Sequence, residues 1–300
     1  MKKQEQLLRR CIHVIVVTFV LGIGFAYATR LKEPVFLTLC VEVSTVPEPE
    51  SGYDQPVFEL QYLTNMDDQK NVTGISFPEA PDISFRATEY GQNYGMMVTF
   101  GTVANQKLGE TIGRYSLRKV YVYMDNYFLK DWKGQIELNT ARLQFNDGST
   151  VQADLGRIIL YSEEAQNWGF ATAVSSSSNQ GEASADYRAI RNLTNVTLQS
   201  PLLSDAGRRM ELSINGQLYE DVSSLKCRKG EKLLIRSRYR KETETGMEGA
   251  EYDFYDVRPV LSYTGEDGSQ GALRIYDLEY RRYFYSYLDV LKYLRSRGEI

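Results

Sequence analysis

The most strongly apolar stretch of the chain lies near its N-terminus and predicts a membrane-spanning helix. Residues 11–28 contain no Asp, Glu, Lys or Arg. As a helix they would extend about 27 Å at 1.5 Å per residue, close to the ~30 Å hydrocarbon core of a bilayer. A helix lets a single segment cross that core with every backbone group hydrogen-bonded. We therefore expect a transmembrane signal anchor at residues 11–28.

Two other interpretations of this stretch remain open. Ala26-Tyr27-Ala28 has the small residues of a signal-peptidase site, so the segment could be removed after Ala28. The stretch could also be a buried core helix, although such a helix usually has a polar face. The length of the apolar run favours a retained anchor.

Beyond the anchor, apolar and polar residues alternate mainly as they do in β-strands. The alternation with period two is clearest in residues 116–124. In residues 135–145 the apolar positions change phase, which predicts a β-bulge near 139–142. The sequence NDGS at 146–149 predicts a hairpin turn. Further strands are expected at 35–43, 57–64, 72–77, 94–102, 157–161, 168–174, 195–199, 210–214, 231–239, 252–257, 260–264 and 272–276, with a hairpin end at 265–268.

The last apolar pattern has the spacing of a helix. Between residues 283 and 297, apolar side chains recur at intervals of three or four, and Gly298 follows where a helix would end. We expect one amphipathic helix there. The residues assigned to its buried face are Phe284, Tyr287, Leu288, Leu291 and Leu294.

These elements predict a mostly β fold class. An N-terminal transmembrane helix would be followed by an antiparallel β-sandwich ectodomain, in two sandwich-like lobes, and a short C-terminal amphipathic helix. Residues 175–186 (SSSSNQGEASAD) lack large apolar side chains and predict a low-complexity linker between the lobes. The expected organisation is a basic tail at 1–10, an anchor at 11–28, a first domain at 35–174, a linker at 175–186 and a second domain at 187–300.

Charge predicts the orientation of the chain and argues against one class of function. Residues 1–32 carry six basic side chains and one acidic one, which leaves −9 for the rest of a chain whose net charge is −4. The larger basic cluster precedes the anchor, so we expect the N-terminus in the cytoplasm and the C-terminal domain outside it. An acidic exterior lacks the basic footprint of nucleic-acid-binding proteins, and no nucleic-acid partner is expected.

The histidine content excludes several catalytic mechanisms. His13 is the one histidine of the chain, and it lies in the expected anchor. The exterior therefore cannot hold a Ser-His-Asp triad, a Cys-His pair or a His-ligated zinc. No nucleotide-binding motif is present either. We expect no cofactor and no metal.

Two cysteines fall in the expected exterior. Cys40 and Cys227 could form a disulfide that ties the two halves together. Two isolated cysteines do not form a disulfide framework, however, and free cysteine packs as a small apolar residue. Two buried thiols are the favoured interpretation.

A row of arginines is the first candidate binding site. Arg236, Arg238 and Arg240 share one face of an expected strand. Paired with residues 250–258, this strand would place basic and acidic rows opposite each other on a solvated face. The alternative is a site for an anionic, phosphate-bearing wall polymer.

The acidic residues of that second strand give another alternative. Glu251, Asp253 and Asp256 lie close together in the sequence. Two carboxylates at a suitable separation could hydrolyse a glycoside. We rank this enzyme hypothesis last, because no acid pair stands out from the many acidic residues.

Tyrosines near the C-terminus are the second candidate binding site. Tyr283, Tyr285 and Tyr287 belong to a cluster in a chain that contains 22 tyrosines. Exposed tyrosines can stack on sugars or contact a protein. Alternatively, they pack the C-terminal helix against a sheet.

Together these features favour a membrane-anchored, extracytoplasmic β-sandwich protein of the cell envelope. Its expected role is that of a binding or accessory module acting through protein–protein contacts. The expected partners are the membrane, through residues 11–28, and an envelope protein. A carbohydrate-binding module for a polysaccharide is the first alternative, and a carboxylate-dependent glycoside hydrolase is the second.

Overall fold

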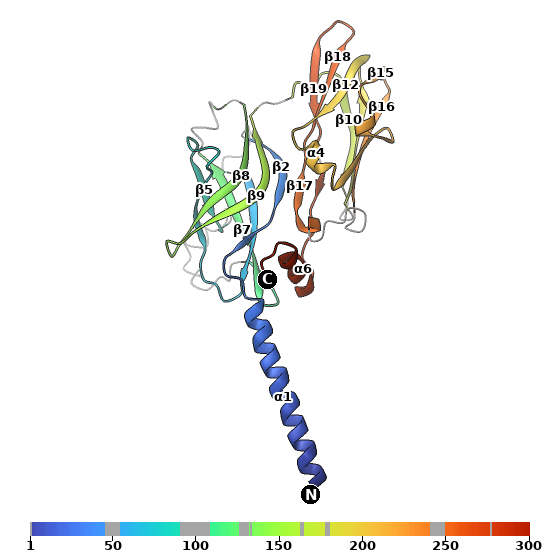
Figure 1. Cartoon of the computed structure of the whole chain (residues 1–300). Helices are drawn as coiled ribbons and strands as arrows, with labels where there is room; N and C mark the ends of the chain where they lie inside the picture. The colour runs from blue at the N-terminus through green and yellow to red at the C-terminus, as the bar shows by residue number, and fades with distance from the viewer. Residues whose placement is uncertain are drawn as a thin grey trace, which may run out of the picture.

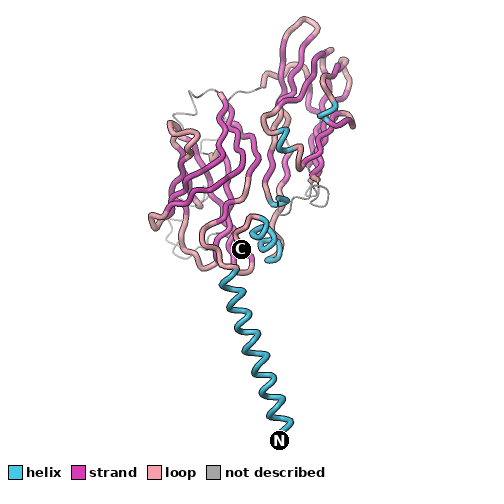
Figure 2. The backbone as a smooth tube through the Cα atoms, in the orientation of Figure 1, coloured by secondary structure: helices cyan, strands magenta, loops and turns pink. Residues whose placement is uncertain are grey.

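The computed structural model describes residues 2–45, 55–90, 109–125, 132, 134–162, 165–177, 181–240, 250–276 and 278–300. A long N-terminal helix projects from a body made of β-sheets (Figures 1 and 2). The fold is mostly β, and a short helix lies near the C-terminus, as the sequence predicts.

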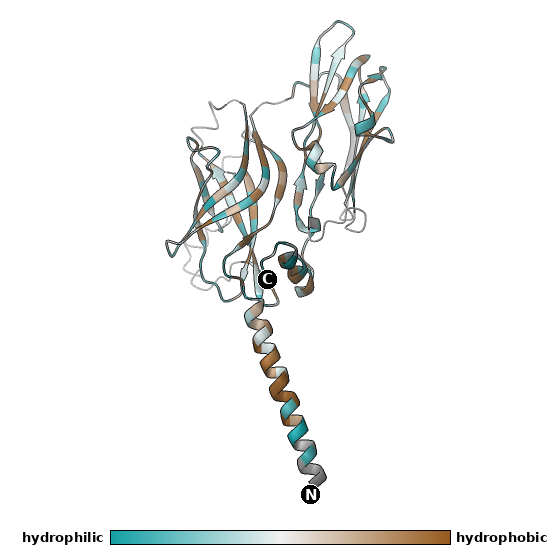
Figure 3. Cartoon of the chain, viewed as in Figure 1, coloured by the Kyte–Doolittle hydropathy of each residue, from teal (hydrophilic) through white to brown (hydrophobic). Residues whose placement is uncertain are grey.

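Helix α1 (Lys2–Ala28) carries the apolar stretch. Its segment Arg9–Ala28 is long and apolar enough to cross a membrane, and none of that segment is buried against the body. Figure 3 shows the apolar residues as a brown band along the helix. The interpretation of this stretch as a buried core helix is therefore wrong, because no other element covers it.

Two sheets form the first sandwich. The first sheet contains, in spatial order, β1 (Val35–Phe36), β3 (Phe58–Asn65), β7 (Tyr115–Met124) and β5 (Phe85–Thr88), with β6 (Glu110–Ile112) beside β7. The second contains β20 (Glu279–Tyr280), β17 (Phe254–Asp256), β2 (Leu39–Ser44), β9 (Thr150–Tyr161), β8 (Gln135–Phe145) and β4 (Val72–Ser76). Their inward side chains, among them Leu60, Val120, Leu138 and Ile158, make one apolar core.

Two further sheets form the second sandwich. One contains, in spatial order, β10 (Phe170–Ser177), β11 (Glu182–Ala189), β16 (Lys232–Tyr239), β13 (Met210–Ile214) and β14 (Gln217–Leu218). The other contains β15 (Leu225–Cys227), β12 (Leu193–Gln199), β18 (Val260–Gly265) and β19 (Gln270–Arg274). The connections include the short helix α4 (Leu203–Ala206) and the single turns η1 (Tyr219–Asp221) and η2 (Ala250–Tyr252). Leu212, Ile235 and Leu261 lie in the core between these sheets.

The two halves of the chain share one sheet. Strands β17 and β20 come from the second half but complete the sheet that contains β2. Strand β2 is parallel to both of its neighbours, β17 and β9, whereas the expected sheets were antiparallel throughout. Long stretches of chain separate β2 from both strands, which is the condition for parallel pairing.

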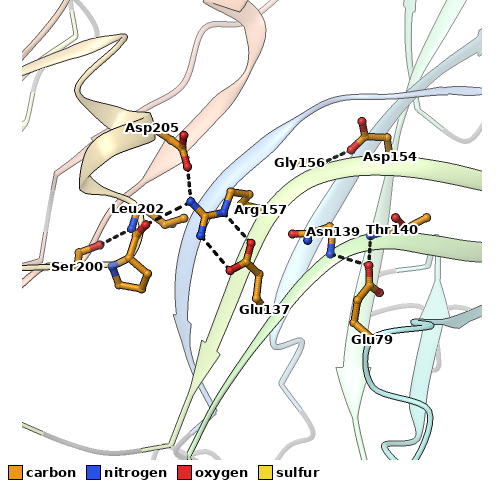
Figure 4. A network of polar contacts seen from close by, with 11 residues as sticks. Glu79, Glu137, Asn139, Thr140, Asp154, Gly156, Arg157, Ser200, Leu202 and Asp205 are labelled. Carbon is orange, nitrogen blue, oxygen red and sulfur yellow. Dashed lines mark hydrogen bonds and ion pairs between the residues drawn. The ribbon is translucent and has the colours of Figure 1, made fainter.

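A half-buried arginine network reinforces this joint (Figure 4). Arg157 of β9 forms a bidentate pair with Glu137 of β8, with nitrogen–oxygen distances of 2.7 and 2.9 Å. The same guanidinium also pairs with Asp205 of α4, in the second half. Charge-assisted, bidentate pairs are among the stronger hydrogen bonds in proteins. Arg157 thus links both halves.

A buried carboxylate makes a second link. Glu42 of β2 accepts a hydrogen bond of 2.9 Å from the Ser200 hydroxyl and one of 2.5 Å from the Arg258 backbone N–H. Burial raises the pKa of Glu42 above its ordinary value. Both donors come from the second half of the chain, so Glu42 links the two sandwiches.

Residues 175–177 and 182–186 of the expected linker belong to two paired β-strands instead. Strands β10 and β11 pair in antiparallel register. Ala183 and Ala185 face the core, and Ala185 is 1% exposed. The linker prediction was wrong because small side chains can fill a narrow space between two sheets. A lack of large apolar residues therefore does not by itself indicate a linker.

The local strand predictions are largely confirmed. The register of β8 against β9 shifts between Leu138 and Thr140, which confirms the bulge. Glu79 accepts from the Thr140 backbone N–H at 2.9 Å (Figure 4), so the irregular backbone stays hydrogen-bonded. Gly148 adopts a φ of 82° in the predicted NDGS turn, a region that favours glycine. The expected strand at 94–102 lies outside the described residues.

The C-terminal helix, α6 (Tyr287–Ser296), begins later than expected. Ser286 caps it, and Asp289 completes a capping box. Its buried side chains are Val290, Leu291, Tyr293 and Leu294, whereas Leu288, assigned to the buried face, is exposed. The helix is rotated relative to the expectation because Tyr293 occupies the core. These residues join Leu31, Tyr115, Tyr252 and Phe284 in a third apolar cluster.

Candidate functional site

The arginine row lies on the outer face of β16, as expected, but with different neighbours. Strand β16 pairs with β11 and β13, not with residues 250–258, so that part of the prediction is wrong. Arg238 lies opposite Glu182 and Glu211 and forms an ion pair of 3.1 Å with Glu211. Arg236 lies opposite two serines, and Arg240 follows the end of the strand. The face carries both signs of charge.

The three acidic candidates do not form an acid pair with one another. Glu251 pairs with Arg282, and Asp256 pairs with Arg258 at 2.6 Å. Burial raises the pKa of Asp253 to about 6. Glu251 and Asp256 are thus each neutralised by an arginine, while Asp253 holds a proton more tightly than an ordinary aspartate. This arrangement differs from the paired carboxylates of a glycoside hydrolase.

The three tyrosine candidates occupy different environments. Tyr287 is half-buried and stacks on Tyr115 with ring centroids 5.7 Å apart. Tyr283 lies 5.5 Å from the Arg281 guanidinium. Tyr285 is fully on the surface, 79% exposed. The cluster seen in the sequence therefore does not make a single platform for a sugar.

The two cysteines that follow α1 are buried thiols. Cys40 and Cys227 are both free, and both belong to the core of the second sandwich. Burial raises the pKa of Cys40 to about 12 and that of Cys227 to about 11. A thiol with such a pKa is a poor nucleophile at neutral pH. The expected alternative, a disulfide, is absent from this structure.

A cleft lies where β2, β3 and β17 meet, between strands from the two halves. Its volume is about 230 Å³. Alternate residues of β2, which are Leu39, Val41 and Val43, give it an apolar wall, and Phe58 and Phe254 extend that wall. Side chains with this period share one face of a strand, so the local sequence of β2 builds the apolar surface directly.

Three arginines line the same cleft, and one of them differs from the others. Arg258 and Arg282 are each paired with a carboxylate. Arg281 has no ion pair or hydrogen bond within the described part of the chain. It lies instead 5.2 Å from the Phe254 ring and 5.5 Å from the Tyr283 ring. Aromatic contacts of this kind hold a guanidinium in place and leave its N–H groups available.

The cleft is suited to a small amphipathic group. Pockets for drug-sized molecules usually have volumes of roughly 300–1,000 Å³, so this cleft takes about one large side chain or a short segment. An anion could pair with Arg281 while an apolar group contacts the β2 wall. The sequence did not indicate this site, because β2 and the Arg281-Arg282-Tyr283 segment come together through the fold and not through a motif.

A larger hollow lies over β18 and β19, with a volume of about 730 Å³. Its wall includes Ser262, Gln270 and Arg274, and it is mostly polar. Ser162 and Ala165 also line it, and the two residues between them lie outside the described residues. We assign no site to this hollow.

Comparisons with known proteins do not assign a family. No protein-family model matches the chain, and no curated protein matches it. Among solved structures, the crystal structure of the human desmocollin-1 ectodomain aligns at 11% identity with a TM-score of 0.19. The alignment covers 82% of this chain and 36% of that chain, so the chain spans about a third of that ectodomain. A likeness this weak carries no argument about function.

Proposed function

We propose that this chain is a single-pass membrane protein of the cell envelope that binds a partner protein through its extracytoplasmic body. The binding site is the cleft between β2, β3 and β17, defined above. The observation that carries the proposal is Arg281, a cation without an ionic partner in the described part of the chain, at the edge of an apolar wall. The favoured ligand is a protein segment that places a carboxylate beside an apolar side chain.

The contact between α1 and the body supports a retained anchor. Arg114 donates hydrogen bonds to the Ala26 carbonyl oxygen and to Thr29 Oγ1. A cation at a helix C-terminus is favourable, because the last carbonyl groups lack partners within the helix. Cleavage after Ala28 would remove the Ala26 acceptor and place a new, largely protonated amino group beside Arg114. A retained α1 avoids this repulsion.

The other two function classes have less support. An anionic polymer would have to approach Arg236 and Arg238 across a face that also carries Glu211 and Glu182. A carboxylate hydrolase would need two acids poised around a substrate, whereas Glu251 is engaged by Arg282. Neither arrangement provides a surface that is both apolar and charged, as the cleft does.

Site-specific photo-crosslinking in the native host tests this proposal. A photoreactive amino acid replaces Tyr283, which is 52% exposed and lies beside Arg281. We expect one discrete protein adduct. Because hydrogen bonds to charged groups contribute about 1.5–3 kcal/mol, Arg281→Gln should reduce the yield of that adduct about tenfold or more. Arg238→Gln, on the outer face of β16, serves as the matched control and should leave the yield unchanged.

Three outcomes would contradict the proposal. An adduct whose yield is the same with Arg281→Gln would place the partner elsewhere. Loss with Arg238→Gln alone would transfer the site to the arginine row. A polysaccharide that co-purifies in place of a protein would favour the polymer-binding alternative.

A further inference from the structure

Two apolar side chains at the start of α6 are unusually exposed. Tyr285 is 79% exposed and Leu288 is 73% exposed. Outside α1, they are the most exposed large hydrophobic side chains of the described residues. Scattered apolar side chains on a surface are ordinary, but these two lie three residues apart at the start of one helix, and we treat them together as one patch.

This patch lies next to the point where α1 ends. The Tyr287 ring stacks on Tyr115 at 5.7 Å between centroids, and the Tyr115 hydroxyl donates to the Thr29 carbonyl oxygen. Two contacts therefore connect the start of α6 to the first residue after α1. Gly113 permits this close approach, because a Cβ atom at that position would overlap the Tyr287 ring. Figure 1 likewise shows α6 beside the body end of α1.

The junction between α1 and the body is packed. Thr29 and Leu31 are both buried, and Leu31 contributes to the same apolar cluster as the buried face of α6. Arg114 additionally bonds the last turn of α1 to the turn between β6 and β7. The patch consequently keeps a defined position relative to the end of α1.

We propose that Tyr285 and Leu288 enter the headgroup layer of the outer leaflet and form a second membrane contact beside α1. This inference rests on the proposed function, in which α1 spans the bilayer. A spanning α1 would leave the bilayer near Thr29. The patch is joined to Thr29 through Tyr287 and Tyr115, so it would lie at the level of the membrane–water interface. Tyrosine is enriched at that level, and the apolar face of an interfacial helix enters about 5–10 Å into the boundary between headgroups and acyl chains.

Both signs of charge lie around the patch, and Lys32 and Arg295 are the cations that can contact phosphate-bearing headgroups. Lys32 is exposed directly after α1, and Arg295 is exposed on α6. Arg30 forms an ion pair of 2.9 Å with Asp67, and Glu33 is exposed beside Lys32. The one acid within the patch, Asp289, accepts from the backbone N–H groups of Tyr285 and Ser286 at 3.2 and 2.9 Å. Its charge is therefore directed at the helix start, and Tyr285 and Leu288 make the patch itself apolar.

Spin labels on the full chain in phospholipid nanodiscs test this contact. Cys11 is replaced by Ser because it is exposed and would take a label. Cys40 and Cys227 are kept, because they are buried thiols with raised pKa values. Four variants then carry one added cysteine each for the spin label. Leu288 and Tyr285 are the patch positions, Val16 reports on α1, and Ile190 reports on the body. Ile190 is the control, because it lies far from α1. Its backbone N–H donates to the Gly169 carbonyl oxygen, and Gly169 packs on Tyr263 of β18. Strand β18 lies at the end of the body farthest from α1 (Figure 1).

Each label is scored by its access to oxygen, which partitions into lipid, and to a water-soluble nickel complex. We expect the labels at 285 and 288 to favour oxygen over nickel, at a shallower depth than the label at 16, while the label at 190 favours nickel. If 285 and 288 resemble 190 while 16 reports lipid, the second contact is overturned and the anchor stands. If 16 reports water, the anchor itself is overturned and the second contact with it.

Discussion

At the scale of single residues, Asp253 gives the clearest link between structure and pH. Burial raises its pKa to about 6 from an ordinary value of 3.8. The folded state therefore binds the proton more tightly than the unfolded state does. The resulting stabilisation is complete below about pH 4 and is lost as the pH rises through about 6.

We predict that Asp253→Asn leaves the free energy of unfolding unchanged at pH 4 and raises it by about 1–3 kcal/mol at pH 7.5, since one pKa unit corresponds to about 1.4 kcal/mol. Urea titrations of the full chain in detergent at both pH values measure this. Asp82→Asn, at an exposed aspartate, is the control and should have little effect at either pH. An equal change for Asp253→Asn at both pH values would contradict the account.

The sequence allowed one part of the candidate site residues to be predicted, and their partners in space could not be predicted from it. The outward face of Arg236 and Arg238 followed from the period of two. Their partners, Glu182 and Glu211, did not, because pairing between distant strands leaves no local signal. Arg281 was missed for a related reason: its ring contact with Phe254 and its lack of a carboxylate partner among the described residues exist only in the folded chain.

At the scale of elements, local patterns predicted strands well where the apolar residues were large. Strands β7 and β8 and the bulge in β8 follow from such patterns. Strand β11 was missed, because three of its four core positions are alanines. The start of α6 was misplaced by the tyrosines before it, although Ser286 and Asp289 have the spacing of a capping box and could have located it.

The pairing of β10 and β11 predicts that Ala185 and Ser184 respond differently to the same substitution, which a flexible linker would not. Ala185→Asp puts a charge into the core and should destabilise the chain by about 3 kcal/mol or more. Ser184→Asp places the same carboxylate on the outer face opposite Arg236 and should change stability by less than about 1 kcal/mol. Thermal unfolding of both variants measures the difference, and equal effects would contradict the strand assignment.

At the scale of the whole molecule, the two sandwiches are joined by a shared sheet and by side-chain contacts, in addition to the covalent chain. Strand β17 completes a sheet of the first sandwich, and Glu42 and Arg157 bind groups of the second half. The sequence predicted two lobes but not this shared sheet, because strands more than two hundred residues apart pair in it. The cleft that we propose as the binding site exists because of this joint.

The central claim is that α1 holds an extracytoplasmic body at the membrane. Labelling of a cysteine at Ile190 with a membrane-impermeant maleimide, on intact spheroplasts and after permeabilisation, tests it most directly. The experiment uses the Cys11→Ser variant as its parent protein. Labelling of that parent, which retains the buried Cys40 and Cys227, gives the baseline signal. The account predicts that Ile190→Cys is labelled equally in both samples. Labelling that requires permeabilisation would place the body in the cytoplasm and contradict the account.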